Sequence, residues 1–234
     1  MNNQILRLKL KQRLNKLASN DYDNIEDWQI LEAFNKAQIE WVRRMLHGNN
    51  LYKEGDELSK RRIDDLQILL TELNLTGAVT DGYFETTNFP PEDYLEYKRI
   101  SVKANQDCCP EPRSMTDYLC EEANVNLYLR DPLKRPDFEW AETFCTLINN
   151  TVRIYVRDFN IVSSTLTYYR KPVNIEFAGI LNPYTGVTSA VDVISEFKDD
   201  IVELILDDTA ALIAGDIENF NQMQREQQAA ERNN

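Results

Sequence analysis

The sequence has few of the residues from which most catalytic and metal sites are built. Its 234 residues include one histidine, His47, and four cysteines, none in a C-x-x-C pair. Zinc sites need closely spaced Cys and His ligands, and the adjacent Cys108 and Cys109 are a poor geometry for one tetrahedral ion. His47 lies at an expected helix C-terminus, where a partner of the helix dipole is typical. We therefore expect no metal, no cofactor and no enzymatic activity.

Phosphate-binding and membrane signals are also missing. Neither G-x-x-x-x-G-K-[ST] nor G-x-G-x-x-G occurs, so nucleotide binding has no support. No apolar run approaches the ~20 residues of a membrane-spanning helix. Charges are scattered through the N-terminal segment, which is unlike a secretory signal. The three tryptophans are expected to anchor the core or an interface and not to stack on nucleic-acid bases: Trp28, Trp41 and Trp140.

The net charge of −13 is unevenly distributed. Residues 1–17 carry cations and no acid: Arg7, Lys9, Lys11, Arg13 and Lys16. Residues 192–208 carry many acids against Lys198 alone, among them Asp199, Asp200, Glu203, Asp207 and Asp208. An acidic protein wraps nucleic acid poorly, because phosphate neutralisation dominates such binding. The basic segment fits either a solvated helix face or a contact surface for an acidic partner.

Helical spacing dominates the first third of the chain. Residues 1–17 have a narrow seam of Leu6, Leu10, Leu14 and Leu17, which suits packing against another helix. A second helix is expected over 25–46, with Ile30, Phe34, Ala37, Trp41 and Met45 on one face. A third is expected over 56–74, with a stripe of Ile63, Leu66, Leu70 and Leu73, forming a hairpin with the second.

Strand signals follow from Gly77. Asp81-Gly82 between two short β-prone runs predicts a tight hairpin. Residues 95–105 predict a strand that buries Ile100, Val102 and Ala104. The irregular stretch from residue 106 is expected to lead into a helix over 114–129 that buries Met115, Leu119 and Leu127. The whole of 106–140 is interpreted as an excursion between two strands of one sheet.

The stretch 143–215 is expected to hold the core together. Its runs FCTLI, TVRIYV and VSSTLTYYR predict a three-stranded meander, with Val152, Ile154 and Val156 facing inward. A long acidic helix over 189–215 follows, with a stripe of Ile194, Phe197, Ile201, Leu204 or Ile205, and Leu212. Sheet and helix are expected to pack as two layers. The fold class is α+β, with a basic arm at 1–20, a body at 21–215 and a polar tail at 216–234.

Three sequence segments, in their order along the chain, resemble a known family. They are LEAFNKAQIEWVRRML, then TFCTLINNTVRIYVRDFNIVSSTLTYYRKPVNI, then EFKDDIVELILDDTAALIAGDIENF. Together they are similar to head-to-tail connector proteins of tailed bacteriophages, most like the ring proteins of crAss-like podoviruses. The resemblance covers most of the chain and includes no catalytic signature.

The resemblance implies a structural role in the virion. Such proteins form twelve-fold rings that join the portal to the tail and line the channel through which DNA leaves. The implied partners are other copies of the chain, the portal protein, neighbouring tail rings and passing genomic DNA without sequence-specific binding, with no membrane. A ring interface needs two different complementary patches. We expect two such patches in this chain. One consists of the basic residues 7, 9, 11, 13 and 16, and the other consists of the acidic residues 199, 200, 203, 207 and 208. The alternative is a non-enzymatic intracellular adaptor that binds a protein partner as a monomer or dimer.

Overall fold

The structure is a computed structural model that describes residues 1–15, 25–47, 64–181 and 186–216. The chain divides into two compact units. The helical unit combines the two ends of the chain, Met1–Ile68 and Pro172–Asn234, and the sheet unit is the continuous stretch Leu69–Lys171. The expected mixed α+β class is confirmed. The sheet and the C-terminal helix, which were expected to pack as two layers, belong to different units.

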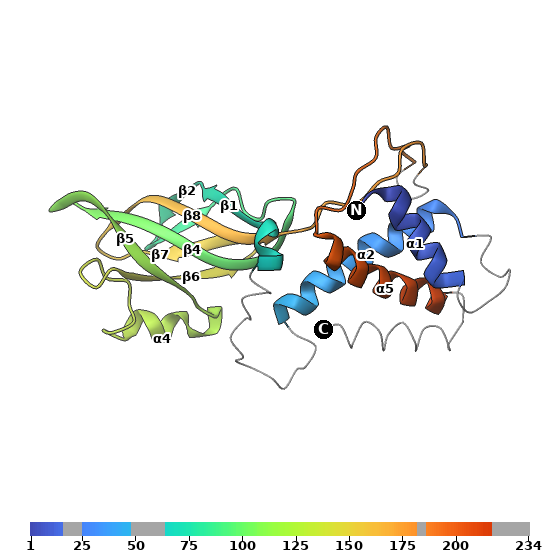
Figure 1. Cartoon of the computed structure of the whole chain (residues 1–234). Coiled ribbons are helices and arrows are strands. Elements are labelled where there is room, and N and C mark those ends of the chain that lie inside the picture. Colours follow the sequence, from blue (N-terminus) through green and yellow to red (C-terminus); the bar gives the residue numbers. More distant parts are fainter. Residues whose placement is uncertain (16–24, 48–63, 182–185, 217–234) are drawn as a thin grey trace. The chain divides into compact units, whose positions relative to one another are not determined.

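Among the described residues, the helical unit contains the helices α1 (Asn3–Asn15), α2 (Asp27–His47) and α5 (Asp199–Asp216). They lie side by side in Figure 1, and α5 packs against both α1 and α2. A helix with a partner on two sides must be apolar over most of its circumference. The buried side chains of α5 are accordingly spread around the helix: Ile201, Val202, Ile205, Leu206, Thr209, Ala210, Ala211, Ile213 and Ala214.

The second helix matches its prediction closely. Ile30, Phe34, Ala37 and Trp41 are buried on one face of α2, as their spacing requires. Trp41 meets Phe197, just before α5, edge-on, with ring centroids 5.4 Å apart. The predicted hairpin partner over 56–74 lies partly in residues 48–63, outside the described residues.

Extended chain leads into α5, in the described residues 172–181 and 186–198. Buried amide side chains attach it to the helices: Asn3 of α1 donates to the carbonyls of Glu176 (2.9 Å) and Val193 (3.1 Å). Asn35 of α2 exchanges two hydrogen bonds with the backbone of Ile175. These contacts hold the chain extended where a helix was expected. The helix therefore begins at Asp199 and not at Ser189, and Ile194 is 55% exposed, so its place in the buried stripe was wrong.

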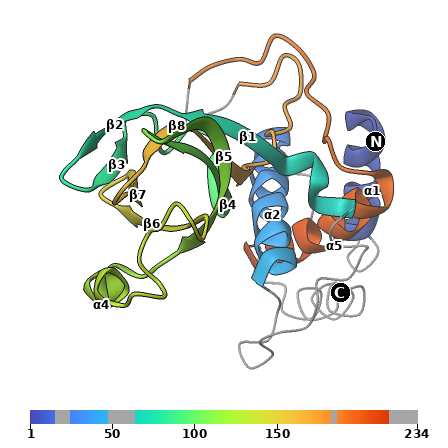
Figure 2. The same cartoon turned by 90° about the vertical axis from the view of Figure 1, so that its left-hand side faces the viewer.

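The sheet unit is one curled eight-stranded sheet with the order β1-β8-β4-β5-β6-β7-β3-β2. Figure 2 shows the strands following one another round a curve, with α4 outside it. The strands are β1 (Leu70–Leu75), β2 (Gly77–Thr80), β3 (Tyr83–Thr86), β4 (Tyr94–Gln106), β5 (Cys109–Leu119), β6 (Glu142–Ile148), β7 (Thr151–Tyr155) and β8 (Asn160–Arg170). All neighbours pair antiparallel except β5 and β6, which are parallel.

The two terminal strands of the sheet are consecutive in the chain. β1 pairs with β8 and β2 with β3, and Thr76 alone separates β1 from β2. Gly77 follows this change of partner and lies against the opposing strand: a Cβ atom there would be 2.0 Å from the carbonyl oxygen of Glu85. A side chain cannot fit at that distance, so the close approach requires glycine. The Asp81-Gly82 hairpin is confirmed, with positive φ at both residues.

The inner face of the curled sheet forms an apolar core. Ile100, Val102 and Ala104 of β4 are buried there, as predicted, together with Val152, Ile154 and Val156. A smaller cluster on the connection between β5 and β6 joins Cys120 and Val125 to Phe144 and Tyr155. The helix α4 (Val125–Arg130) lies in that connection.

Three sequence predictions for this unit were wrong. Residues 70–74 form strand β1 and not the end of a helix, because they pair with β8 along their whole length. Residues 114–119 belong to strand β5 and not to a helix; Met115 is buried, but Leu119 and Leu127 are exposed. The three runs from residue 143 are strands, but β8 leaves the expected meander and lies between β1 and β4.

Candidate functional site

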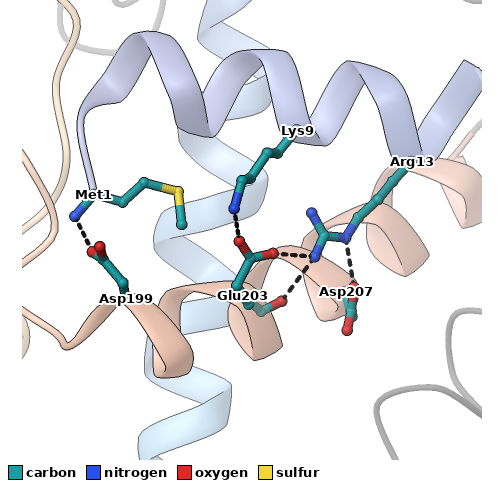
Figure 3. A network of polar contacts seen from close by, with 6 residues as sticks. All are labelled: Met1, Lys9, Arg13, Asp199, Glu203 and Asp207. Carbon is teal, nitrogen blue, oxygen red and sulfur yellow. Dashed lines mark hydrogen bonds and ion pairs between the residues drawn. The ribbon is translucent and has the colours of Figure 1, made fainter.

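The predicted basic and acidic residues meet within one chain. Lys9 of α1 forms an ion pair with Glu203 of α5, and Arg13 reaches Glu203 (2.5 Å) and Asp207 (2.6 Å). The N-terminal amino group lies 2.5 Å from Asp199. Figure 3 shows that these contacts run along the facing sides of α1 and α5.

Burial and charge oppose each other at the centre of this network. Burial lowers the pKa of Arg13, but the hydrogen bonds with Glu203 and Asp207 outweigh it and raise the pKa above its ordinary value. Burial raises the pKa of Glu203, but hydrogen bonds from Arg13 and Lys9 outweigh it and lower the pKa overall. Both groups are therefore charged at neutral pH and held in that state by each other.

Two further ion pairs each join a predicted interface residue, Asp208 or Arg7, to a residue that the sequence did not single out as one. Arg44 of α2 pairs with Asp208 on the other side of α5. Burial raises the pKa of Asp208, and Arg44 offsets this only in part. Arg7 pairs with Asp27 at the start of α2, at 2.7 Å. The sequence already shows that the C-terminal turn of α2 is cationic. Which acidic residue pairs with it depends on how the helices pack.

The other predicted interface residues have different positions. Lys11 and Asp200 make no ion pair among the described residues, and Asp200 is exposed. Lys16 lies outside the described residues. Seven of the ten predicted residues thus form ion pairs within the described part of one chain, and four of them join α1 to α5.

The N-terminal segment is also part of the hydrophobic core. Leu6, Leu10 and Leu14 are fully buried. The seam predicted from their spacing is confirmed for these three leucines, and Leu17 lies outside the described residues. Residues 1–15, which were expected to belong to an arm, are grouped with α2 and α5 in the helical unit. A segment that contributes three buried leucines stabilises the unit it packs into.

A buried group of ionisable side chains lies in the sheet unit. Asp117 is on the same face of β5 as buried Met115, and neither of its carboxylate oxygens has a hydrogen-bond partner among the described residues. Burial raises its pKa to about 7, and the nearby Cys145 thiol lowers it in part without reaching hydrogen-bonding geometry. The hydroxyl of Tyr97 lies 3.9 Å from Cys145 Sγ.

This group does not form a recognisable catalytic arrangement. Burial raises the pKa of both Cys145 and Tyr97, so the thiol and the phenol are neutral at physiological pH. A neutral buried thiol is a poor nucleophile. Within the described residues, no three His, Cys, Asp or Glu side chains gather where they could hold a metal ion.

The connection between β5 and β6 exposes large apolar side chains. Leu133 is 80% exposed and Trp140 is 72% exposed, and Leu127 and Leu129 of α4 also point away from the core. Trp140 follows a turn in which Asp137 accepts hydrogen bonds from the backbone N–H groups of Glu139 and Trp140. The backbone that carries this indole is therefore held in place while its side chain is uncovered.

Comparison with protein-family models and with curated protein sequences found no match for this chain. No helix among the described residues is long and apolar enough to cross a membrane.

Proposed function

We propose that the protein is a structural subunit of an oligomeric ring at the head-to-tail junction of a tailed bacteriophage virion. In this role about twelve copies join the portal to the tail, and DNA leaves the capsid through their channel. The proposal rests on the resemblance of the sequence to connector ring proteins. It also fits the absence of a recognisable catalytic arrangement in the described part of the chain.

The observation that carries the proposal is the uncovered apolar surface of the β5–β6 connection. Leu127, Leu129, Leu133 and Trp140 are all exposed, although the same connection buries Val125 and Phe138. Clusters of exposed large apolar side chains are typical of protein–protein contacts, and tryptophan is enriched at their centres. In the ring, this surface contacts the neighbouring copy.

The charge of the protein is consistent with a DNA channel. With a net charge of −13, the subunit repels phosphates overall. A channel wall of that sign lets DNA slide, whereas a basic wall would hold it. The α1–α5 ion pairs have a different role in this proposal, because they join parts of one subunit.

The test is the oligomeric state of the purified full-length protein, alone and mixed with a portal protein from the same phage. Native mass spectrometry is expected to show a closed ring of about twelve copies, at least on the portal. A protein that stays monomeric with the portal present would contradict the ring; a monomer or dimer that binds a different protein would favour the adaptor alternative.

Variants locate the contact. Leu133→Asp combined with Trp140→Ser is expected to prevent ring formation while leaving the melting temperature within about 2 °C, because both side chains are exposed. Val191→Asp is the matched control, since Val191 is exposed in the helical unit. Equal assembly of the double variant and the control would show that the β5–β6 connection is not the contact.

A further inference from the structure

Two adjacent thiols lie at the tip of the β4–β5 hairpin. Gln106 pairs with Cys109 across the two strands, which leaves Asp107 and Cys108 in the turn. Cys108 and Cys109 are exposed, and their Sγ atoms are 3.8 Å apart. The two remaining cysteines, Cys120 and Cys145, are buried. The molecule thus presents one pair of accessible thiols side by side.

The geometry of neighbouring residues disfavours a direct bond between these sulfurs. Consecutive Cα atoms are about 3.8 Å apart, whereas disulfides usually join Cα atoms at about 4.4–6.8 Å. This requirement on the Cα–Cα distance does not apply when a single atom bridges the two sulfurs. Two bonds of roughly 2.3 Å, the length typical of zinc–thiolate bonds, span the observed 3.8 Å at an angle of roughly 110°. The pair is therefore better arranged to hold one atom between the sulfurs than to join them.

The number of protein ligands at this site limits which kind of atom can bind between the two sulfurs. A structural zinc ion needs four ligands, and no third Cys, His, Asp or Glu joins the pair among the described residues. The atom that binds here must therefore need only two sulfur ligands from the protein. Trivalent arsenic that carries one organic group meets this requirement, because two thiolates complete its three bonds.

We propose that Cys108 and Cys109 form a bidentate dithiol site that takes a thiophilic trivalent centre of the organoarsenical class. With an arsenoxide, two As–S bonds form and both bonds to oxygen break. The oxygen leaves as water with the two thiol protons. Arsenic stays trivalent, so the step needs no oxidant or reductant. The proposal is independent of the ring proposed above.

The two thiols influence each other before any ligand binds. The hydrogen bond between the two thiols, together with the charge of Cys108 when it is ionised, raises the pKa of the Cys109 thiol. The Sγ of Cys108 also lies 3.4 Å from the amide oxygen of Gln106. The Cys109 thiol is consequently protonated at neutral pH, and attack by its thiolate accelerates as the pH rises.

The experiment uses reduced full-length protein and phenylarsine oxide as the probe, read by intact mass and by competition with glutathione. One arsenical per chain is expected, resistant to glutathione and removed by dithiothreitol. Cys108→Ser and Cys109→Ser should each weaken binding by at least about 100-fold, because the second bond then loses its high effective concentration. The double variant, which keeps Cys120 and Cys145, should not bind.

Three results would overturn the proposal. The first is single-serine variants that bind as tightly as the parent, which would mean that one sulfur suffices. The second is a double variant that still binds while its melting curve is unchanged, which would place the adduct on the buried cysteines. The third is a parent protein that loses two hydrogens when the reductant is removed and then refuses the arsenical, since this would show that the direct disulfide forms instead.

Discussion

Each of the two units of this protein contains a partly buried carboxyl group, and the surroundings of the two groups are opposite. In the helical unit, Glu203 is held by Lys9 and Arg13 and its pKa is lowered. In the sheet unit, both carboxylate oxygens of Asp117 are buried and have no hydrogen-bond partner among the described residues, and burial raises its pKa to about 7. A paired buried charge is costly to break, whereas an unpaired one is costly to keep.

The units also differ in how the chain builds them. The helical unit needs both ends of the sequence, since α1 packs against α5. The sheet unit is continuous from Leu69 to Lys171. A change in one unit should therefore leave the other protected, and hydrogen exchange read by mass spectrometry can assign each effect to its unit.

The largest effect is expected from deleting residues 1–15. Removal of three fully buried leucines, at about 2–5 kcal/mol for each Leu→Ala equivalent, approaches or exceeds the ~5–15 kcal/mol stability of a typical domain. The helical unit should lose its protection against hydrogen exchange, while the sheet unit keeps its own. A truncated protein with a protected α5 would show that α1 is an appendage.

A matched pair of point variants sharpens the same test. Leu10→Asp places a charge in the core of the helical unit, and Leu8→Asp places it on the exposed side of α1, where Leu8 is 69% exposed. The first should destabilise by several kcal/mol, on the order of other buried unpaired charges. The second should be nearly neutral, and similar losses in both variants would contradict the packing described for α1.

Gly77→Ala is expected to have the next largest effect, in the sheet unit alone. The new methyl group would lie 2.0 Å from the carbonyl oxygen of Glu85, so the backbone of β2 or β3 must move. We expect a loss of about 3–4 kcal/mol, at the upper end for overpacking, measured by urea denaturation. Ala78→Ser, at the next and exposed position, is the control. A loss below about 1 kcal/mol would mean that this close approach does not restrict the sheet.

Local patterns predicted the elements better than their partners. The alternation in TVRIYV and the Asp-Gly turn specify strand and hairpin within a few residues, so both were found. The strand at Leu70–Leu75 was missed because its leucines also fit helical spacing, and only pairing with β8 decides between the two. Strand β5 begins with Cys-Pro-Glu-Pro, which gives no strand signal, and β4 and β6 hold its later residues in the sheet.

The charged residues show the same limit. Their clustering near the two ends of the chain was plain from the sequence, and the structure brings Lys9, Arg13, Glu203 and Asp207 together. Charge alone does not say whether opposite patches meet within one chain or between copies. In α1 the buried leucines Leu6, Leu10 and Leu14 belong to the same helix as the cations. Their packing into the unit therefore brings the cations of α1 to the acids of the same chain. Nothing in the sequence around Asp117 indicates that its carboxylate is buried.

Asp117→Asn is expected to stabilise the sheet unit at alkaline pH. The folded pKa of about 7 lies above the ordinary value of 3.8, so between these pH values the folded state holds more protons than the unfolded state. The stability that the protonated form contributes is fully present below the unfolded pKa and is lost as pH rises through about 7. An amide does not ionise, so the variant lacks this loss. Because one pKa unit corresponds to about 1.4 kcal/mol, the variant should exceed the parent by up to about 4 kcal/mol at pH 8.

The pH dependence of that difference separates charge from packing. Urea denaturation of variant and parent should give curves that diverge from about pH 4 upward and run parallel above about pH 8. Glu111→Gln on the same strand is the control, since Glu111 is exposed and its replacement should leave the pH profile unchanged. A constant difference at every pH would show that Asn merely packs differently. A parent that gains stability relative to the variant between pH 4 and pH 7 would mean that the carboxylate has a partner, and the contrast between the two units would then fail.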